Sequence, residues 1–276
     1  MKIKAFCSDI DGTLLDSTRE ISQRLKDIIK TLPDDFPVIL ASSRMPDAMR
    51  HLLHDLGRPS QPLISYNGGY VLSAKGEVLE DVSIPVHLVA KILKLTKGTD
   101  IHVSLYQGEN WYEEKDDYWS QREIRNTKVN CTWLHADGVL DLWSKGTCGA
   151  HKVMCMGDSQ EMAWLFGELH FEHALDLHLY RSSNTYLEIA PRAISKATGL
   201  KKILDHSYEF GMESVIAFGD NYNDIDLLQS VGWGVAVGNA RAEVKAVAKE
   251  ISLHHKEDGV AAALEKIRDL EFEVQL

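Results

Sequence analysis

The chain has 276 residues, 44% of them hydrophobic, which is long enough for two domains with real cores. It carries 30 Lys and Arg residues against 41 Asp and Glu residues, a formal net charge of -11. This charge would repel a nucleic-acid backbone or an anionic membrane surface, so we expect neither as a partner. A site for an anionic ligand therefore needs local positive charge from a metal ion, a Lys or an Arg.

The first part of the chain alternates between strand and helix patterns. Strands are predicted over residues 3–7 and 37–41, and helices over 20–31 and 46–56, the second of which ends at Gly57. Alternation of this kind implies right-handed crossovers and a mostly parallel sheet that is covered on both faces.

The middle of the chain has a different rhythm. A helix is predicted from about Pro85 to Thr96, followed by a hairpin around residues 107–110. Asp158 followed by Glu161 is typical of a capping box that opens the next helix. Two strands, over 177–180 and 186–189, complete this section.

The alternating pattern returns in the last part, with helices over 196–206 and 224–229 and strands over 215–218 and 234–237. We therefore predict an α/β protein with a Rossmann-like, doubly wound, mostly parallel sheet and an inserted α+β cap domain. The core domain is predicted to comprise residues 1–82 and 184–276, and the cap to comprise residues 83–183.

The cysteines and the N-terminus indicate the compartment. The four cysteines show no CxxC spacing, and Cys7 and Cys155 lie in apolar runs typical of buried strands. The first apolar stretch is too short for a signal peptide, and no run approaches the ~20 apolar residues of a membrane span. We expect a cytoplasmic protein, and the sequence leaves its oligomeric state unknown.

Ligands of open parallel sheets bind at the carboxyl ends of the strands, so the polar residues there are the first candidates. After the first strand come Asp9 and Asp11, which would point in opposite directions in extended chain. Gly12 could turn the backbone and bring both carboxylates to one site. The alternative is an ordinary solvated Asp-Gly turn.

Three later segments offer complementary groups. Ser42, Ser43 and Arg44 follow the second strand with hydroxyl, amide and guanidinium donors, although such residues also occur at many helix entrances. Lys196 begins a helix, where an isolated Lys is commonly a solvated surface residue. The turn at 219–224 carries two carboxylates, of which the second could simply cap the following helix.

Together these segments supply the parts of a phosphoryl-transfer site. Such a site needs a nucleophile, a hard cation, donors to the phosphate oxygens and an acid for the leaving group. Asp9 and Asp220 suit Mg²⁺, which prefers oxygen ligands, and Ser42 and Lys196 could hold the phosphate.

The ordered set of motifs resembles the haloacid dehalogenase superfamily, and within it the Cof-type phosphatases with an inserted α/β cap of type IIB. The resemblance covers nearly the whole chain. Its segments are DIDGTLLD at 9–16, ASSR at 41–44, SYNGG at 65–69, YLEIAPRAISK at 186–196, GDNYND at 219–224, GVAVGNA at 234–240 and EDGVAAAL at 257–264.

The resemblance implies a role for each matching residue. Asp9 would be the nucleophile and a metal ligand, Asp11 the general acid and base with its main-chain oxygen on the metal, and Asp220 the remaining metal ligand. The phosphate would be bound by Ile10, Ser42, Ser43, Lys196 and Asn223, with Asp224 orienting Lys196 and with Arg44, Asn67 and Gly68 in support. The chain departs from the family at Ser42 and Ser43, where members often have Thr and then Gly.

The predicted function is that of a magnesium-dependent phosphatase of small phosphomonoesters, such as sugar phosphates, acting through an aspartyl phosphate. One alternative is a phosphomutase or phosphotransferase, which uses the same covalent chemistry. Another is a non-catalytic phosphoacceptor domain, although there the acceptor Asp follows the acidic pair by one strand, whereas here Asp9 lies on the first strand. The predicted partner is a small phosphorylated metabolite, and the inserted section is expected to act as a lid that selects it.

Overall fold

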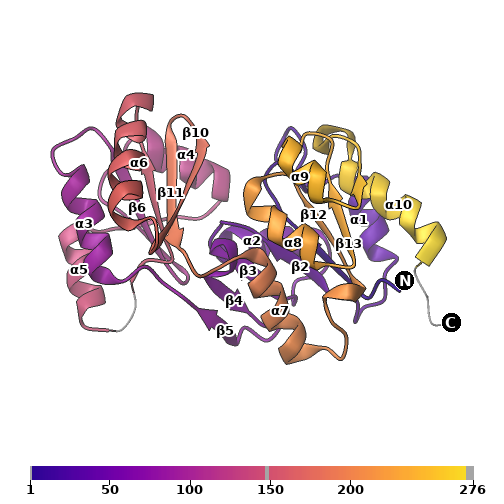
Figure 1. The fold of residues 1–276 in the computed structure, drawn as a ribbon. Helices are drawn as coiled ribbons and strands as arrows, with labels where there is room; N and C mark the ends of the chain where they lie inside the picture. Colours follow the sequence, from indigo (N-terminus) through magenta and orange to yellow (C-terminus); the bar gives the residue numbers. More distant parts are fainter. Residues whose placement is uncertain (1, 147–148, 272–276) are drawn as a thin grey trace. The chain divides into compact units, whose positions relative to one another are not determined.

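The computed structural model describes residues 2–146 and 149–271, so Cys148 lies outside the described part (Figure 1). The chain divides into two compact units, Met1–Glu80 with Ser195–Leu276, and Asp81–Ile194. The prediction ends the inserted unit at residue 183, which is wrong. The strand that follows this position pairs with two strands of the inserted unit, so a boundary there would split a sheet.

The first unit is built on an eight-stranded sheet. The strand order is β14-β13-β12-β1-β2-β3-β4-β5, and the neighbours from β14 to β3 are all parallel. Strand β4 runs antiparallel to β3. The strands are β1 Ala5–Ser8, β2 Val38–Ala41, β3 Leu63–Ser65, β4 Tyr70–Leu72, β5 Val78–Asp81, β12 Val215–Gly219, β13 Trp233–Ala236 and β14 Glu250–Ile251.

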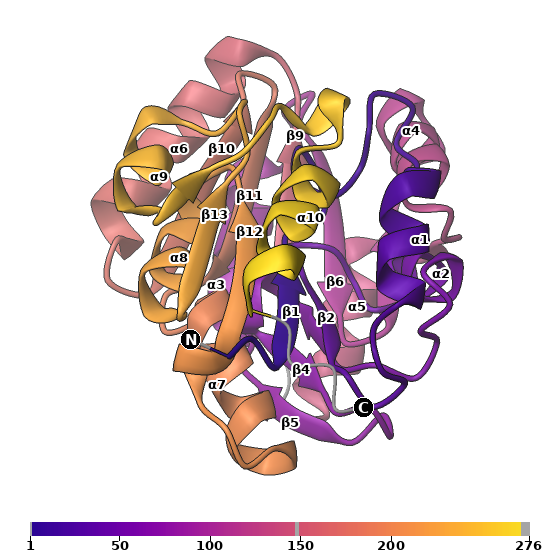
Figure 2. The same cartoon turned by 90° about the vertical axis from the view of Figure 1, so that its right-hand side faces the viewer.

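Helices cover both faces of this sheet, as the doubly wound prediction requires. Alternate residues of β1 point to opposite faces, so Phe6 joins one core and Cys7 the other. Figure 2 shows α1 and α2 on one side of the strands and α8 and α9 on the other. The helices of this unit are α1 Gln23–Lys30, α2 Asp47–Asp55, α7 Lys196–Ser207, α8 Ile225–Ser230, α9 Ala242–Val247 and α10 Gly259–Glu271.

Helix starts follow local capping chemistry. The first predicted helix begins later than expected, because the Ser22 hydroxyl accepts a hydrogen bond from the Leu25 N–H and fixes the start at Gln23. Asp224 does not cap α8 in the way its position suggested. A 3₁₀ turn, Tyr222–Asp224, precedes α8, and the side chain of Asn221 caps it.

The second unit is built on a six-stranded sheet of order β10-β11-β9-β6-β7-β8. Neighbouring strands from β10 to β7 are antiparallel, and β7 and β8 are parallel. This matches the predicted α+β cap. The strands are β6 His102–Gln107, β7 Asn110–Glu113, β8 Thr132–Trp133, β9 Lys152–Met156, β10 Leu177–Ser183 and β11 Tyr186–Pro191. The helices are α3 Val86–Thr96, α4 Tyr118–Thr127, α5 Ala136–Ser144 and α6 Ser159–His173.

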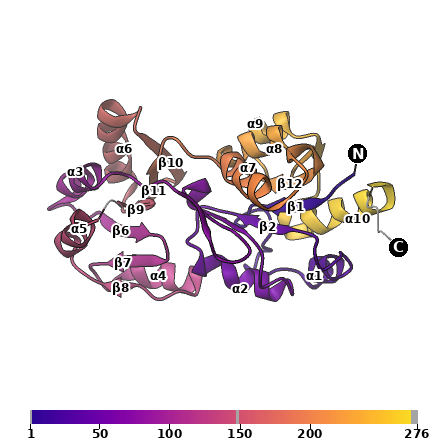
Figure 3. The same cartoon turned by 90° about the horizontal axis from the view of Figure 1, so that it is seen from below.

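One face of the second sheet packs against α3, α5 and α6, which Figure 3 shows grouped beside the strands. Asp158 caps α6 as predicted, accepting hydrogen bonds from the N–H groups of Gln160 and Glu161. The Glu161 carboxylate bonds to the N–H of Asp100, so the capping box is not formed. Within the described residues, no helix combines the length and apolar character needed to cross a bilayer.

Candidate functional site

The predicted site residues of the first unit meet at one edge of its sheet. Strands β12, β1 and β2 are adjacent and parallel, so their carboxyl ends lie side by side. Asp220, Asp9 and Ser42 directly follow these three strands. The strand order therefore brings together side chains that are far apart in the sequence.

Lys196 is the central cation of this group. Its side chain is completely buried, and its Nζ donates to Oδ1 of Asp9 at 2.5 Å and to Oδ1 of Asp224 at 2.7 Å. A solvated surface Lys is therefore ruled out. Burial alone would lower the pKa of Lys196, but Asp224 and Asp9 raise it above its ordinary value, so the ammonium stays charged.

Asp224 holds Lys196 in place. While its Oδ1 accepts from Lys196, its Oδ2 accepts from the N–H groups of Asp220 and Asn221, both at 3.0 Å. Every oxygen of this carboxylate is thus committed to a donor. We assign Asp224 to orientation, as predicted, and not to ligand binding.

Asp9 and Asp220 retain the capacity to bind a ligand. Oδ2 of Asp9 is buried and has no hydrogen-bond partner within the described residues. Oδ1 of Asp220 accepts a long bond from Thr13 at 3.3 Å, and its Oδ2 one from Asn239 at 3.4 Å. Burying a carboxylate oxygen without a hydrogen-bond donor costs free energy. The free oxygen therefore indicates a position where a bound ligand or metal ion would supply the missing interaction.

The arrangement fits a divalent metal ion. Oxygens of Asp9, Asp220 and Asp224 lie within 4.8 Å of one another. Burial and the neighbouring carboxylates Asp224 and Asp220 raise the pKa of Asp9, while burial and Asp224 raise the pKa of Asp220 to about 6. A hard cation would relieve this repulsion and use the free oxygens, and Mg²⁺ prefers such ligands.

Gly12 makes the turn that the sequence analysis required. Its φ is +86°, in the left-handed region, and a Cβ on it would lie 2.6 Å from Oδ2 of Asp220. The Ile10 side chain is buried in the core, so Ile10 could bind phosphate only through its main chain. The segment is therefore a structured turn packed against Asp220, not a solvated one.

The predicted phosphate-binding residues come from four segments: Ile10 follows β1, Ser42 and Ser43 follow β2, Lys196 begins α7, and Asn223 lies in the turn after β12. Ser42 is buried and its carbonyl accepts from the N–H of Asn67 at 2.9 Å, while Ser43 is half-buried. The side-chain amide of Asn223 donates to Oδ1 of Asn67 at 2.9 Å. Asn67 thus joins the loop after β2 to the loop after β12.

Gly68 supports the start of α7. Its φ is +102°, and a Cβ on it would lie 2.2 Å from the main-chain oxygen of Ser195. Any side chain here would push the loop away from the residue that precedes Lys196. Gly68 therefore supports the site because the absence of a side chain lets its backbone lie close to Ser195.

The Asp11 carboxylate is bound by arginines. Nε and Nη2 of Arg44 donate to its Oδ2 and Oδ1 at 2.7 and 2.8 Å, and Nη2 of Arg19 donates to Oδ1 at 2.8 Å. Burial would raise the pKa of Asp11, but Arg44 and Arg19 outweigh it and hold the pKa below its ordinary value. The third carboxylate near Asp9 and Asp220 is therefore Asp224 and not the Asp11 side chain.

Sequence reasoning missed three residues of this site. Thr13 and Asn239 both contact Asp220, and Asn239 also donates to the carbonyl of Gly12 at 2.7 Å. Both lie inside motif segments that the sequence analysis quoted, which was the available signal. Arg19 lies outside every quoted segment, and no pattern in the sequence marked it.

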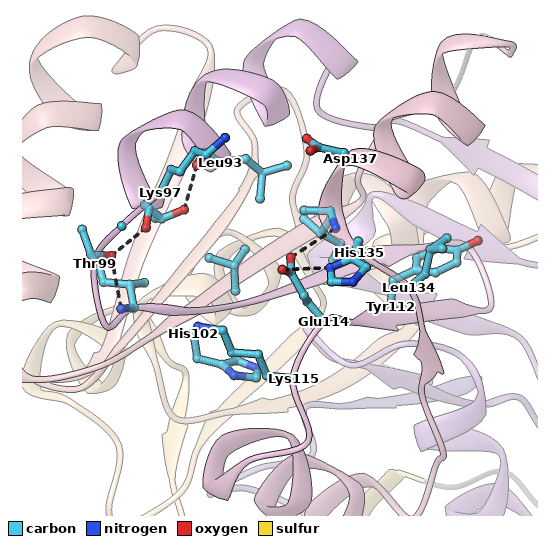
Figure 4. Close-up of a pocket in the computed structure, with 16 residues that line it drawn as sticks. Leu93, Lys97, Thr99, His102, Tyr112, Glu114, Lys115, Leu134, His135 and Asp137 are labelled. Atoms are coloured by element: carbon cyan, nitrogen blue, oxygen red, sulfur yellow. Dashed lines mark hydrogen bonds and ion pairs between the residues drawn. The ribbon is translucent and has the colours of Figure 1, made fainter.

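A separate cavity of about 290 Å³ lies within the second unit, lined by residues from the end of α3 to the start of α5 (Figure 4). Its lining mixes apolar and polar side chains. Nδ1 of His135 lies 3.0 Å from Oε1 of Glu114, a pair that can be followed in Figure 4. None of the predicted catalytic residues lines it. We therefore assign the chemistry to the aspartate group of the first unit.

Comparisons with known proteins agree with this geometry. The sequence model of the haloacid dehalogenase-like hydrolases matches residues 6–264. The 5-amino-6-(5-phospho-D-ribitylamino)uracil phosphatase of Bacillus subtilis is 26% identical over 264 residues, covering 94% of this chain and 95% of that protein. An HMP-PP phosphatase of Yersinia pseudotuberculosis is 27% identical over 239 residues, covering 86% and 84%. A haloacid dehalogenase-like hydrolase of known structure from Bacteroides thetaiotaomicron is 30% identical with a TM-score of 0.86, covering 96% and 100%.

Proposed function

Since the chain is a phosphatase of the haloacid dehalogenase-like hydrolase family, we propose that it hydrolyses small phosphomonoesters through an aspartyl phosphate on Asp9. The observation that carries this proposal is the Asp9 carboxylate. One of its oxygens is held by Lys196 at 2.5 Å, while the other is buried without a partner among the described residues. An oriented carboxylate with one free oxygen beside a buried cation is suited to attack on phosphorus.

The proposed reaction has two steps. A carboxylate oxygen of Asp9 forms a bond to phosphorus as the bond to the leaving oxygen breaks. Asp11 gives that oxygen a proton, so it must enter this step in its protonated form, although Arg44 and Arg19 favour its ionised form in the structure. Asp11 then takes a proton from water as the water oxygen attacks phosphorus, which frees phosphate and restores Asp9.

Lys196, Ser42 and the Asn223 amide would hold the remaining phosphate oxygens. The bond of Lys196 to Asp9 and the link of Asn223 and Ser42 through Asn67 support this role.

We further propose that Mg²⁺ is the metal, held by Asp9 and Asp220 with the main-chain oxygen of Asp11. When bound, the ion would offset the negative charge of the phosphate beside the carboxylates of Asp9 and Asp220. The long contacts of Asp220 with Thr13 and Asn239 leave its oxygens available for this role.

The substrate class is proposed to be sugar phosphates or related phosphorylated metabolites. The B. subtilis relative is named for a small phosphorylated metabolite of this kind. The inserted unit is proposed to act as a lid that selects the organic part of the ester. Two facts support this: every proposed catalytic residue lies in the first unit, and Lys196 follows the second junction, Ile194 to Ser195, at once.

A phosphate-release screen tests the activity. Phosphorylated metabolites are incubated with Mg²⁺, and inorganic phosphate is measured beside Asp9→Asn as the matched control. Release by the parent and none by the variant is the expected result. Phosphate transfer to an acceptor without release would instead identify a phosphotransferase or phosphomutase, and absence of both would overturn the proposal.

Exchanging the inserted unit tests the lid. Residues 81–194 are replaced by the corresponding segment of a relative with a different substrate, using the boundaries of the structure. After circular dichroism shows a folded chimera, its ranking of substrates is compared with those of both parents. We expect the ranking to follow the inserted segment, and a ranking that follows the first unit would contradict the lid assignment.

A further inference from the structure

Two of the quoted motif segments supply no residue to the proposed reaction. They are GVAVGNA at 234–240, which runs from β13 into the loop after it, and EDGVAAAL at 257–264, which leads into α10. A short turn that begins at His255 precedes the second segment and contacts the first. There the N–H of His255 donates to Oδ1 of Asn239 at 3.0 Å.

The orientation of the Asn239 side-chain amide is fixed by its partners. Its Oδ1 accepts from the N–H of His255, a group that can only donate, so Nδ2 must face the other way. Nδ2 donates to the carbonyl of Gly12 at 2.7 Å and lies 3.4 Å from Oδ2 of Asp220. Asn239 therefore connects the loop after β1 with the loop after β12.

The turn at Gly12 needs a restraint of this kind. Glycine has more conformational freedom than any other residue, and Gly12 adopts a left-handed φ of +86°. The carbonyl of Asp11, which is proposed to bind the metal ion, lies one residue earlier in the same turn. The short bond from Asn239 to the Gly12 carbonyl therefore limits how far this turn can move.

The loop after β13 holds Asp220 as well. The N–H of Arg241 donates to the main-chain carbonyl of Asp220 at 3.0 Å, which fixes the backbone. The carboxylate has only the long contacts with Asn239 and Thr13, at 3.4 and 3.3 Å. Asp220 is thus kept in place while its oxygens stay available, as a metal ligand requires.

His255 in turn keeps Asn239 in position. Its ring Nδ1 lies 2.7 Å from the carbonyl of Leu15, which can only accept, so Nδ1 carries the proton and donates. Leu15 belongs to the same motif segment as Gly12. The turn at His255 is therefore bonded to this segment through its ring and to Asn239 through its main chain.

We propose that Asn239 is a positioning residue of the metal site, which holds the Asp11–Gly12 turn and Asp220 in the arrangement that Mg²⁺ requires before the ion binds. The inference rests on the proposed function, because it presupposes Asp220 and the main-chain oxygen of Asp11 as ligands. Residues that orient metal ligands in this way commonly change metal affinity by about 10- to 100-fold.

The experiment compares Asn239→Ala with the parent and with Gln61→Ala. The first variant removes the amide that spans the two loops. The second is the matched control, since Oε1 of Gln61 also accepts from a main-chain N–H, that of Val38 at 2.9 Å, but at the amino end of β2. In chelator we expect both variants to melt about 2–4 °C below the parent, the cost of one or two hydrogen bonds.

The deciding quantity is the dissociation constant of Mg²⁺ in the absence of substrate. It is measured by calorimetry and by the rise of the melting temperature with Mg²⁺ concentration. We expect Asn239→Ala to raise this constant about ten-fold or more. Gln61→Ala should leave it within about two-fold of the parent value, because its bond lies at the opposite end of the sheet.

Activity supplies an independent readout. The Mg²⁺ concentration for half-maximal phosphate release from p-nitrophenyl phosphate should rise in Asn239→Ala by the same factor as the dissociation constant. At saturating Mg²⁺, kcat should return to within about three-fold of the parent value, because the bound ion then holds its own ligands.

A second pair of variants tests the support of Asn239. His255→Ala removes the ring bond to Leu15 and should raise the dissociation constant of Mg²⁺ about two- to five-fold, which corresponds to one neutral hydrogen bond. His255→Asn keeps a donor at the position of Nδ1 and should lie close to the parent. This pair decides the matter if Asn239→Ala does not fold, and equal constants for His255→Ala and the parent would then overturn the inference.

The remaining outcomes separate the failures. An unchanged constant in folded Asn239→Ala, or equal increases in Asn239→Ala and Gln61→Ala, would show that Asn239 serves stability alone, and the proposed function would stand without the inference. A loss of kcat that saturating Mg²⁺ does not restore would also overturn the inference. If the parent binds no Mg²⁺, the metal assignment of the proposed function fails and the inference fails with it.

Discussion

Each unit of the molecule buries a basic side chain between two carboxylates, and we propose that only the cluster of the first unit serves the chemistry. In the first unit Lys196 lies between Asp9 and Asp224, at 2.5 and 2.7 Å. In the second unit His102 lies between Glu113 and Asp117, at 2.8 Å from each. Burial alone therefore does not distinguish a catalytic cluster from a structural one.

The difference lies in which oxygens have donors. In the second unit, Glu113 accepts from His102 with one oxygen and from Ser104 and Trp111 with the other. Asp117 binds His102 with one oxygen and caps α4 with the other. In the first unit, Oδ2 of Asp9 has no donor among the described residues. The cluster with the unsatisfied oxygen is the one prepared for a ligand.

Replacing Asp9, whose Oδ2 lacks a hydrogen-bond donor among the described residues, should have the largest effect on activity. Asp9→Asn removes the nucleophile, because an amide cannot form the acyl phosphate, and should lower kcat by about 10⁴-fold or more while the fold is kept. Mass spectrometry of protein quenched during turnover should show a phosphate adduct on Asp9 in the parent. Asp11→Asn, as the comparison variant, should still trap some of this adduct, and an adduct on another residue would contradict the mechanism.

Removing divalent metal should have the next largest effect, and only on the first cluster. Chelation should lower activity by about 10³-fold or more, a loss of several kcal/mol of charge stabilisation, and Mg²⁺ should restore it. Mg²⁺ should also raise the melting temperature of the parent but not that of Asp9→Asn to the same extent. Undiminished hydrolysis in excess chelator would contradict the metal assignment.

The sequence allowed the fold class and most of the first cluster to be predicted. Strand ends that carry Asp9, Ser42 and Asp220 can be read locally, because parallel strands bring their carboxyl ends to one edge. The local sequence of Lys196 does not distinguish it from a surface residue, so its place in the site was predicted from the other segments of the set and from the resemblance to a family. Its burial is a property of the assembled sheet.

The second cluster could not be predicted, for a related reason. His102 and Glu113 meet because β6 and β7 pair in a register that places Ser104 beside Glu113 on one face of the sheet. Register depends on the length of the turn and on packing, which short motifs do not encode. The same holds for Arg19, whose contact with Asp11 depends on a strained loop and not on a motif.

Disrupting the cluster of the second unit, in which both carboxylates have donors, should lower stability and leave phosphatase activity unchanged. His102→Ala leaves two carboxylates without their cation, which should destabilise the second unit by about 3 kcal/mol. Burial would lower the pKa of His102, but Glu113 and Asp117 raise it overall, so its contribution is full below about pH 6.5 and is lost as pH rises through the raised value. Thermal unfolding at pH 6 should thus show a larger effect than at pH 9.

The matched control for that variant is His135→Ala, which removes an exposed histidine of the same unit that pairs with Glu114. It should change stability by less than about 1 kcal/mol. Phosphate release from p-nitrophenyl phosphate at a temperature well below unfolding should be unchanged in both variants. Loss of that activity in a folded His102→Ala protein would show that the second cluster serves chemistry after all.

The smallest effect should be a gain of stability in the first cluster when its metal is absent. Burial and Asp224 raise the pKa of Asp220 to about 6, so the folded protein binds a proton there more tightly than the unfolded chain does. Stability in chelator should therefore fall as pH rises from about 4 through about 6, and Asp220→Asn should remove this fall. Above pH 7 without metal, the variant should melt about 2–4 °C higher than the parent, which corresponds to about 1 kcal/mol. Adding Mg²⁺ should reverse the order of the melting temperatures, because only the parent keeps both carboxylate ligands.

The control is Asp226→Asn, which replaces an exposed acid in the first turn of α8 and should show neither change. If Asp220→Asn is less stable than the parent in chelator at every pH, then Asp220 is a structural residue held by Thr13 and Asn239, and the distinction between the two clusters fails at this residue.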